Sequence, residues 1–138
     1  MQKSIVQVMQ VQTGGPVLDM VWSAAGDSLL VATGALQNNI LFVNLAGQTQ
    51  TPTPIGTHDG ITGLVKVQMN GIDLLLTVGA NKQLNVWMNQ GSWAQKMSIN
   101  LPKVPSCIDA DITSNLVAMG LEGELGIYNL NGLQSGNT

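Results

Sequence analysis

The chain has 138 residues, with five Lys, no Arg, eight acidic residues and a formal net charge of −3. Charged residues make up 9% of it, against roughly 25% in typical soluble domains, so a phosphate-binding stripe has little to be built from and nucleic-acid binding by this chain alone is not expected. A single Cys and a single His exclude a Cys/His zinc cluster and a disulfide within the chain.

At the N-terminus, Ser4–Gln12 has Gln residues between short apolar stretches and is predicted as an outermost β-strand that arrives without inner strands of its own. Its pattern is not that of a signal peptide. Elsewhere, no stretch approaches the ~18 consecutive apolar residues of a membrane-spanning helix. We therefore expect a soluble protein without a membrane span.

Residues 14–56 form a first predicted unit of strands separated by turns. The strands are predicted at Val17–Trp22, at the nearly continuous apolar run Leu29–Thr33, and at Ile40–Asn44. A weaker fourth strand, Gln48–Ile55, contains two prolines, which are tolerated at the edge of a sheet.

The pattern recurs in residues 57–101 and, without a fourth strand, in residues 102–131, followed by a tail at 132–138. Val43 and Trp87, which close the third strands of the first two units, are 44 residues apart, and Tyr128 follows 41 residues later. A period of roughly 40–45 residues with four strands per unit is typical of a β-propeller blade. The predicted fold is therefore all-β, a partial propeller with three blades' worth of strands.

Three blades do not close a ring, since propellers have about four to eight. Two explanations stay open. The chain is a fragment of a longer propeller, or copies assemble as a homo-oligomer in which Ser4–Gln12 of one chain completes the last blade of another. A physical reason for the second explanation is that an unpaired strand at a sheet edge promotes aggregation unless another strand covers it.

Several segments resemble eroded WD repeats. His58 with Asp59 and Gly60 resembles the Gly-His opening of the repeat, and Val86-Trp87-Met88 resembles its Trp-Asp close. More narrowly, the chain resembles the family of the nuclear-pore WD-repeat protein of messenger-RNA export and its kinetochore spindle-checkpoint paralogue. The stretches that carry this resemblance are 14–23, 55–60, 101–111 and 116–128.

The resemblance implies a seven-bladed propeller, of which this chain would match about three consecutive blades. It further implies a non-enzymatic scaffold of the nucleus or nuclear envelope, with the cytoplasm as an alternative, that docks a nucleoporin peptide and uses no cofactor. It looks closer to the export factor than to the checkpoint paralogue. Direct RNA contact is not expected, because Arg is absent.

Four residues stand at positions that resemble the hydrogen-bond tetrad of a WD repeat: His58, Thr77, Asn81 and Trp87. We expect a structural role for them, in which they satisfy polar groups that would otherwise be buried without partners. Packing is the expected role of Trp22, Trp93 and Met97, although an exposed Trp93 at a predicted blade rim is the first candidate for a partner contact.

Asp109 and Asp111, two apart on a predicted strand, share a face. Paired carboxylates catalyse glycoside hydrolysis or bind a hard cation, so a propeller or β-sandwich hydrolase is the alternative outside the scaffold class. No third acidic residue lies near in sequence, and we expect no catalytic, metal or cofactor site. A fragment without a function of its own is the remaining alternative.

Overall fold

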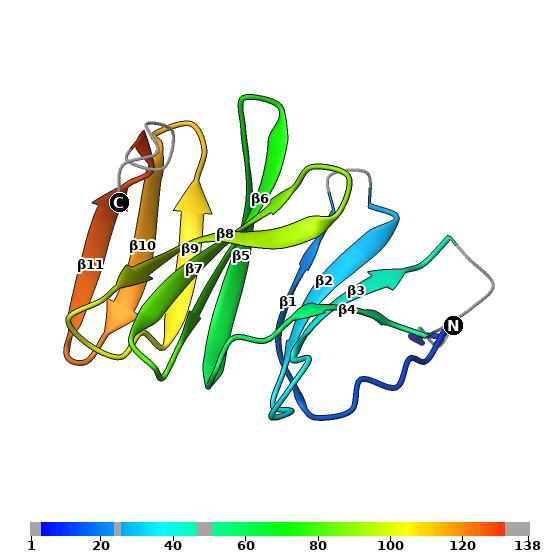
Figure 1. Ribbon diagram of the computed structural model, residues 1–138. Coiled ribbons are helices and arrows are strands. Elements are labelled where there is room, and N and C mark those ends of the chain that lie inside the picture. Colours follow the sequence, from blue (N-terminus) through cyan, green and yellow to red (C-terminus); the bar gives the residue numbers. More distant parts are fainter. Residues whose placement is uncertain (1–3, 24–25, 47–50, 132–138) are drawn as a thin grey trace.

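The computed structural model describes residues 4–23, 26–46 and 51–131 of the chain. Over these residues the protein is all-β, with three antiparallel sheets of four, four and three strands. Each sheet is a meander in which every strand pairs with the next one along the chain. In Figure 1 the sheets stand side by side, with the second between the first and the third. The prediction of an all-β fold is confirmed.

The first sheet contains β1 (Val17–Trp22), β2 (Ser28–Thr33), β3 (Ile40–Asn44) and β4 (Thr53–Gly56). β2 is buried on both faces, as its continuous apolar run predicted, because one face packs on the second sheet and the other on β3 side chains and the N-terminal segment. β4 is shorter than the predicted strand Gln48–Ile55, of which residues 48–50 lie outside the described part of the chain.

The second sheet contains β5 (Ile61–Met69), β6 (Ile72–Gly79), β7 (Gln83–Asn89) and β8 (Trp93–Asn100). The turn from β5 to β6 is Asn70-Gly71, whose φ angles of 54° and 78° are those of a two-residue hairpin turn. The third sheet contains β9 (Cys107–Asp111), β10 (Leu116–Leu121) and β11 (Glu124–Asn129). Each sheet lies within one of the three predicted units.

Two apolar seams join the sheets, and the first strands β1, β5 and β9 are neighbours across them. The first seam, between the first and second sheets, is formed by Leu30, Ala32, Ile40, Ile61, Leu64, Leu75 and Trp87. The second seam joins the second and third sheets; its buried residues include Leu74, Leu76, Val78, Val86, Val117 and Met119. The second sheet is therefore covered on both faces.

Two faces remain without a neighbouring sheet. On the first sheet, Val31, Leu41 and Val43 form a small cluster to which Val11 of the N-terminal segment adds its side chain. On the third sheet, Leu125 and Ile127 are exposed. These two surfaces are called the open face of the first sheet and the open face of the third sheet below.

Residues 4–16 precede β1 and form no strand within this chain. Ile5, Val6 and Val8 are exposed. The strand predicted at Ser4–Gln12 therefore has no partner among the described strands, and its pairing with another chain stays a prediction. The predicted tail 132–138 lies outside the described residues. No helix in the described segments is long and apolar enough to cross a membrane.

Candidate functional site

A groove of about 430 Å³ runs between β4 of the first sheet and the β7–β8 turn of the second. Its apolar lining comes from Phe42, Pro54, Ile55 and Trp93, and the rest of its lining is uncharged. Trp93 is half-buried and packs on the first seam with one part of its surface. A ring that is held on one side and open on the other offers a rigid apolar contact to a ligand.

Trp22 behaves differently from the sequence expectation. The sequence predicts packing for Trp22, and this is wrong, because 60% of its surface is exposed at the end of β1. β1 pairs with β2 alone, and Trp22 stands at the strand's last position, where no neighbouring sheet covers it. Unlike Trp93, Trp22 does not line the groove.

The second sheet brings His58, Thr77, Asn81 and Trp87 together in one chain of hydrogen bonds. Trp87 Nε1–H donates to Thr77 Oγ1 at 3.0 Å. The same hydroxyl lies 2.7 Å from His58 Nδ1, and His58 Nε2 lies 3.0 Å from Asn81 Oδ1. His58 and Thr77 are completely buried. The four residues that the sequence grouped are therefore in direct contact, from the loop before β5, from β6, from the turn after it, and from β7.

The donor and acceptor roles in this series of hydrogen bonds assign the tautomer of His58. The indole N–H can only donate, so the Thr77 hydroxyl accepts it and has its own proton to give to His58 Nδ1. The imidazole proton then sits on Nε2 and is donated to Asn81 Oδ1, which also accepts the backbone N–H of Gln83 at 3.2 Å. The arrangement is complete with a neutral His58.

Burial lowers the pKa of His58 from its ordinary value of 6.5, because desolvation disfavours the charged imidazolium. The hydrogen bond to Asn81 and the nearby charge of Asp59 oppose this shift without cancelling it. A second proton on Nδ1 would also face the Thr77 hydroxyl that now donates to it. Both effects hold the ring in its neutral form at physiological pH.

Asn39 ties the first sheet to the His58 loop, a contact that the sequence did not reveal. Its Nδ2 donates to the carbonyl oxygen of His58 at 2.8 Å, and its Oδ1 accepts the His58 backbone N–H at 2.9 Å. The side chain is almost fully buried. In the sequence, the pair Asn38-Asn39 predicted no more than a tight turn, because turns favour Asn whatever its side chain contacts.

Two glycines make room for the rings. A Cβ at Gly79 would lie 2.8 Å from His58 Cδ2, and one at Gly56 would lie 2.6 Å from two carbons of the Trp87 ring. Real Cβ atoms do not approach neighbours so closely, and buried rings have little space to move aside. Gly79 and Gly56 are therefore part of what positions the hydrogen-bonded chain, since a larger residue at either place would displace a ring.

Asp109 and Asp111 lie on one face of β9, as predicted, and both are exposed. Each is engaged in local bonding: Asp109 Oδ1 accepts the backbone N–H of Ala110 at 2.9 Å, and Asp111 accepts the backbone N–H of Thr113 and the hydroxyl of Ser114, both at 3.1 Å. Neither lines the groove. In the described part of the chain, no group of three or more His, Cys, Asp or Glu is placed to hold a metal ion.

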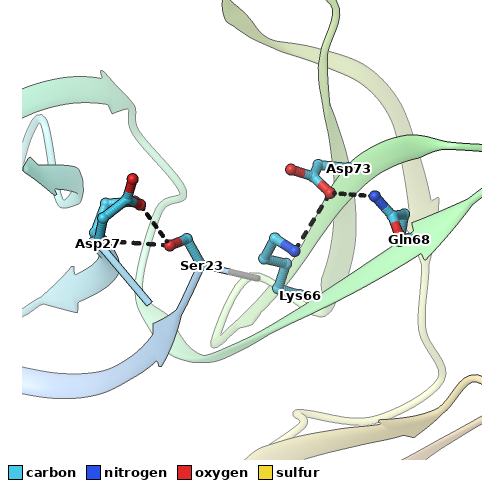
Figure 2. Close-up of polar contacts among 6 residues, drawn as sticks. Ser23, Asp27, Lys66, Gln68 and Asp73 are labelled. Atoms are coloured by element: carbon cyan, nitrogen blue, oxygen red, sulfur yellow. Dashed lines mark hydrogen bonds and ion pairs between the residues drawn. The ribbon is translucent and has the colours of Figure 1, made fainter. Parts of the chain in front are cut away.

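Figure 2 shows polar side-chain contacts in two hairpins, with Ser23, Asp27, Lys66, Gln68 and Asp73 labelled. On the β5–β6 hairpin, Lys66 Nζ lies 3.3 Å from Asp73 Oδ1, which also accepts a hydrogen bond from Gln68 Nε2 at 3.2 Å. In the β1–β2 turn, Ser23 Oγ donates to Asp27 Oδ1 at 3.1 Å. Each group closes its own hairpin, so these charges stabilise turns.

Comparison with protein-family models and with the curated proteins finds no match to this chain.

Proposed function

We propose that this chain is part of a WD-repeat β-propeller and acts as a non-enzymatic protein-interaction scaffold. Support comes from the three meanders packed face to face with their first strands adjacent, an arrangement that a propeller's inner strands also have. The chain of bonds from Trp87 through Thr77 and His58 to Asn81 supports it as well, because it joins the four residues that resemble the tetrad of a WD repeat.

The observation that carries the binding role is the groove at Trp93. Half of its lining residues are apolar, none is charged, it lies between two sheets, and its volume falls in the range of roughly 300–1,000 Å³ that ligand sites occupy. Aromatic side chains that are held in place cost little entropy on binding and are frequent centres of affinity. The groove therefore suits a short peptide that inserts one apolar side chain against Trp93.

The resemblance to the messenger-RNA export family supplies the class of partner: a segment of a nucleoporin, bound at the nuclear envelope. The checkpoint paralogue would bind checkpoint-kinase segments instead. The five Lys of the chain are scattered and Arg is absent, so we propose that binding is to protein and not to RNA.

Fluorescence anisotropy with labelled nucleoporin and checkpoint-kinase peptides tests this proposal. We expect a nucleoporin peptide with an apolar anchor to bind, and Trp93→Ala to weaken it at least tenfold, because truncating a central Trp commonly costs about 2 kcal/mol or more. Trp22→Ala is the matched control, since Trp22 is exposed outside the groove. The affinity of this variant for the nucleoporin peptide should equal that of the unmodified protein. Binding that is equal in the two variants would contradict the proposal, and preference for the kinase peptides would favour the paralogue.

A further inference from the structure

The first and third sheets repeat one another in sequence and register. Leu30-Val31-Ala32-Thr33-Gly34 in and after β2 corresponds to Leu116-Val117-Ala118-Met119-Gly120 in β10. Asp19 on β1 lies opposite Ala32, and Asp109 on β9 lies opposite Ala118. Asp109 is therefore the counterpart of Asp19, and on this face the first two strands of the two sheets carry Asp, Leu and Ala at matching positions.

In the first sheet this face is buried against the second sheet. Leu30 and Ala32 belong to the first seam. Asp19 bridges the seam: its Oδ1 accepts the N–H of the following residue, Met20, at 2.9 Å, and its Oδ2 accepts the backbone N–H of Leu64 on β5 at 3.2 Å. The carboxylate thus ties the edge of one sheet to the first strand of the next.

In the third sheet the same face has no neighbour. Asp109 repeats the local half of the bridge, because its Oδ1 accepts the N–H of the following residue, Ala110, at 2.9 Å. Its Oδ2 makes no hydrogen bond to any described residue, and Asp109 is exposed. Around it, Leu116, Leu125 and Ile127 are exposed as well. The open face of the third sheet therefore corresponds to the face of the first sheet that the second sheet covers in the first seam.

The opposite end of the stack carries the complementary surface. Val117 and Met119 of the third sheet are buried in the second seam, and their counterparts in the first sheet are Val31 and Thr33. Val31 lies with Leu41 and Val43 on the open face of the first sheet, where all three are at most 5% exposed and Val11 of the N-terminal segment packs against them. Met20 of β1, on the same side of the sheet, is 57% exposed and is the part of this face that is free for a further contact. The two ends of each chain therefore present the two opposite sheet faces that meet in the internal seams, although the side chains of those seams differ.

We propose that a second copy of this chain covers these faces, with the third sheet of each copy packed on the first sheet of the other. A twofold axis generates both contacts at once and closes a ring of six sheets, which is within the range of about four to eight blades of known propellers. In each contact, Asp109 Oδ2 accepts a backbone N–H from β1 of the second copy, as Asp19 does from β5.

The N-terminal segment fits the same assembly. Val11 packs beside the open face of the first sheet. In the same way, Ile55 of β4 packs beside the first seam and Ile99 of β8 packs beside the second seam. β4 and β8 are the fourth strands of their sheets, and the third sheet ends at β11 without one among the described residues. Ser4–Gln12 of one copy is placed to pair with β11 of the other.

Light scattering on the purified 138-residue chain over a range of concentrations tests the proposal. We expect a mass of twice 14.5 kDa. Ile127→Asp, on the open face of the third sheet, should reduce the mass to that of one chain. Ile112→Asp is the matched control: Ile112 is 53% exposed and Ile127 is 54% exposed, but Ile112 lies in the β9–β10 turn, so the control should stay dimeric.

Asp109→Ala, which removes no apolar contact, should raise the dissociation constant of the dimer about tenfold.

Mixing two variants tests the head-to-tail geometry. Met20 is exposed on the open side of β1, next to Asp19, and Met20→Asp should also give monomers. An equimolar mixture of Met20→Asp and Ile127→Asp restores one undamaged contact per pair, so a heterodimer should appear at concentrations where each variant alone is monomeric. A contact between two identical faces would give no such rescue.

A wild-type chain that stays monomeric while folded, forms open-ended polymers, or dimerises unaffected by Ile127→Asp would overturn the proposal, as would a mixture without rescue. The inference does not depend on peptide binding. Dimerisation without binding would contradict the proposed function alone, and binding by a folded monomer would contradict the dimer alone.

Discussion

The two seams of the molecule join similar sheets by different chemistry. The first seam contains Trp87 and is bordered by side-chain hydrogen bonds, including those of Asn39 to the His58 loop and of Asp19 to β5. The second seam is dominated by aliphatic side chains and Met. Among the described residues, the side-chain hydrogen bond that crosses beside it runs from Thr62 Oγ1 to the carbonyl oxygen of Pro105 at 2.7 Å.

The difference shows that one strand arrangement can be stabilised in two ways. Apolar packing is non-directional and tolerates swaps that conserve volume. A buried hydrogen-bonded chain is directional, fixes the rings in place, and becomes costly when one member is removed. We therefore expect the second seam to respond to lost volume and the first seam to lost hydrogen bonds and to acid.

The largest effect is expected from a cavity in the second seam. Leu76 is completely buried, and Leu76→Ala should lower the free energy of unfolding by about 2–5 kcal/mol, because it removes apolar contacts and leaves a cavity. Urea denaturation followed by circular dichroism measures this. Leu36→Ala is the control: Leu36 is 92% exposed in the β2–β3 turn, and its change should stay within about 0.5 kcal/mol. Equal effects would contradict the assigned packing.

A smaller loss is expected from the first seam when one hydroxyl is removed. Thr77→Val keeps the volume but deprives Trp87 Nε1–H of its acceptor and His58 Nδ1 of its donor. An orphaned buried polar group costs about 1–3 kcal/mol, and the same urea experiment should show a loss of that size. Thr113→Val, in an exposed turn, should be near neutral. A neutral Thr77→Val would mean that the chain of bonds does not stabilise the fold.

Acid should weaken the first seam through His58. The pKa of His58 in the folded protein lies below its ordinary value of 6.5, so the unfolded chain binds the proton more readily between those two values. Stability contributed by neutral His58 is present above pH 6.5 and is lost as the pH falls through the folded pKa. The urea midpoint should fall as the pH is lowered from 7.5 to 5. His58→Gln should remove the part of this pH dependence that comes from the protonation of His58. An unchanged slope in His58→Gln would contradict it.

The smallest effect is expected at the ion pair of the β5–β6 hairpin. Lys66 and Asp73 are 3.3 Å apart and both are partly exposed to solvent. Such pairs contribute about 1 kcal/mol or less, because water and salt screen them. Lys66→Met should therefore change stability by no more than that, and raising the salt concentration should reduce the difference. A loss as large as that of Leu76→Ala would show that the charge stabilises the sheet stack itself.

Much of the strand layout followed from the sequence. The predicted bounds of β1 match the structure, and β2 differs by one residue, because turn residues and the change from alternating to continuous apolar patterns are local signals. The contacts among His58, Thr77, Asn81 and Trp87 were anticipated from the resemblance of their positions to a known repeat, and not from spacing alone.

Other features could not be predicted, because they depend on which sheets become neighbours. Asp19 and Leu64 are 45 residues apart and meet only when β1 packs on β5. Asn39 reaches His58 for the same reason. Packing is predicted for Trp22 from its apolar size, whereas its exposure depends on its lying, like Met20, on the side of β1 that no sheet covers. Long-range pairing leaves no local trace in one sequence.

The central claim is that three sheets stack in chain order, with the second covered on both faces. Methyl–methyl nuclear Overhauser effects in a sample labelled at Ala, Ile, Leu, Met and Val methyls test it most directly. The account predicts cross-peaks from Leu30 and Ala32 to Leu64 or Leu75, and from Leu76 to Val117 or Met119. Cross-peaks from Leu76 to Leu116 or Ile127 instead would place the opposite face of the third sheet in the seam and contradict the account.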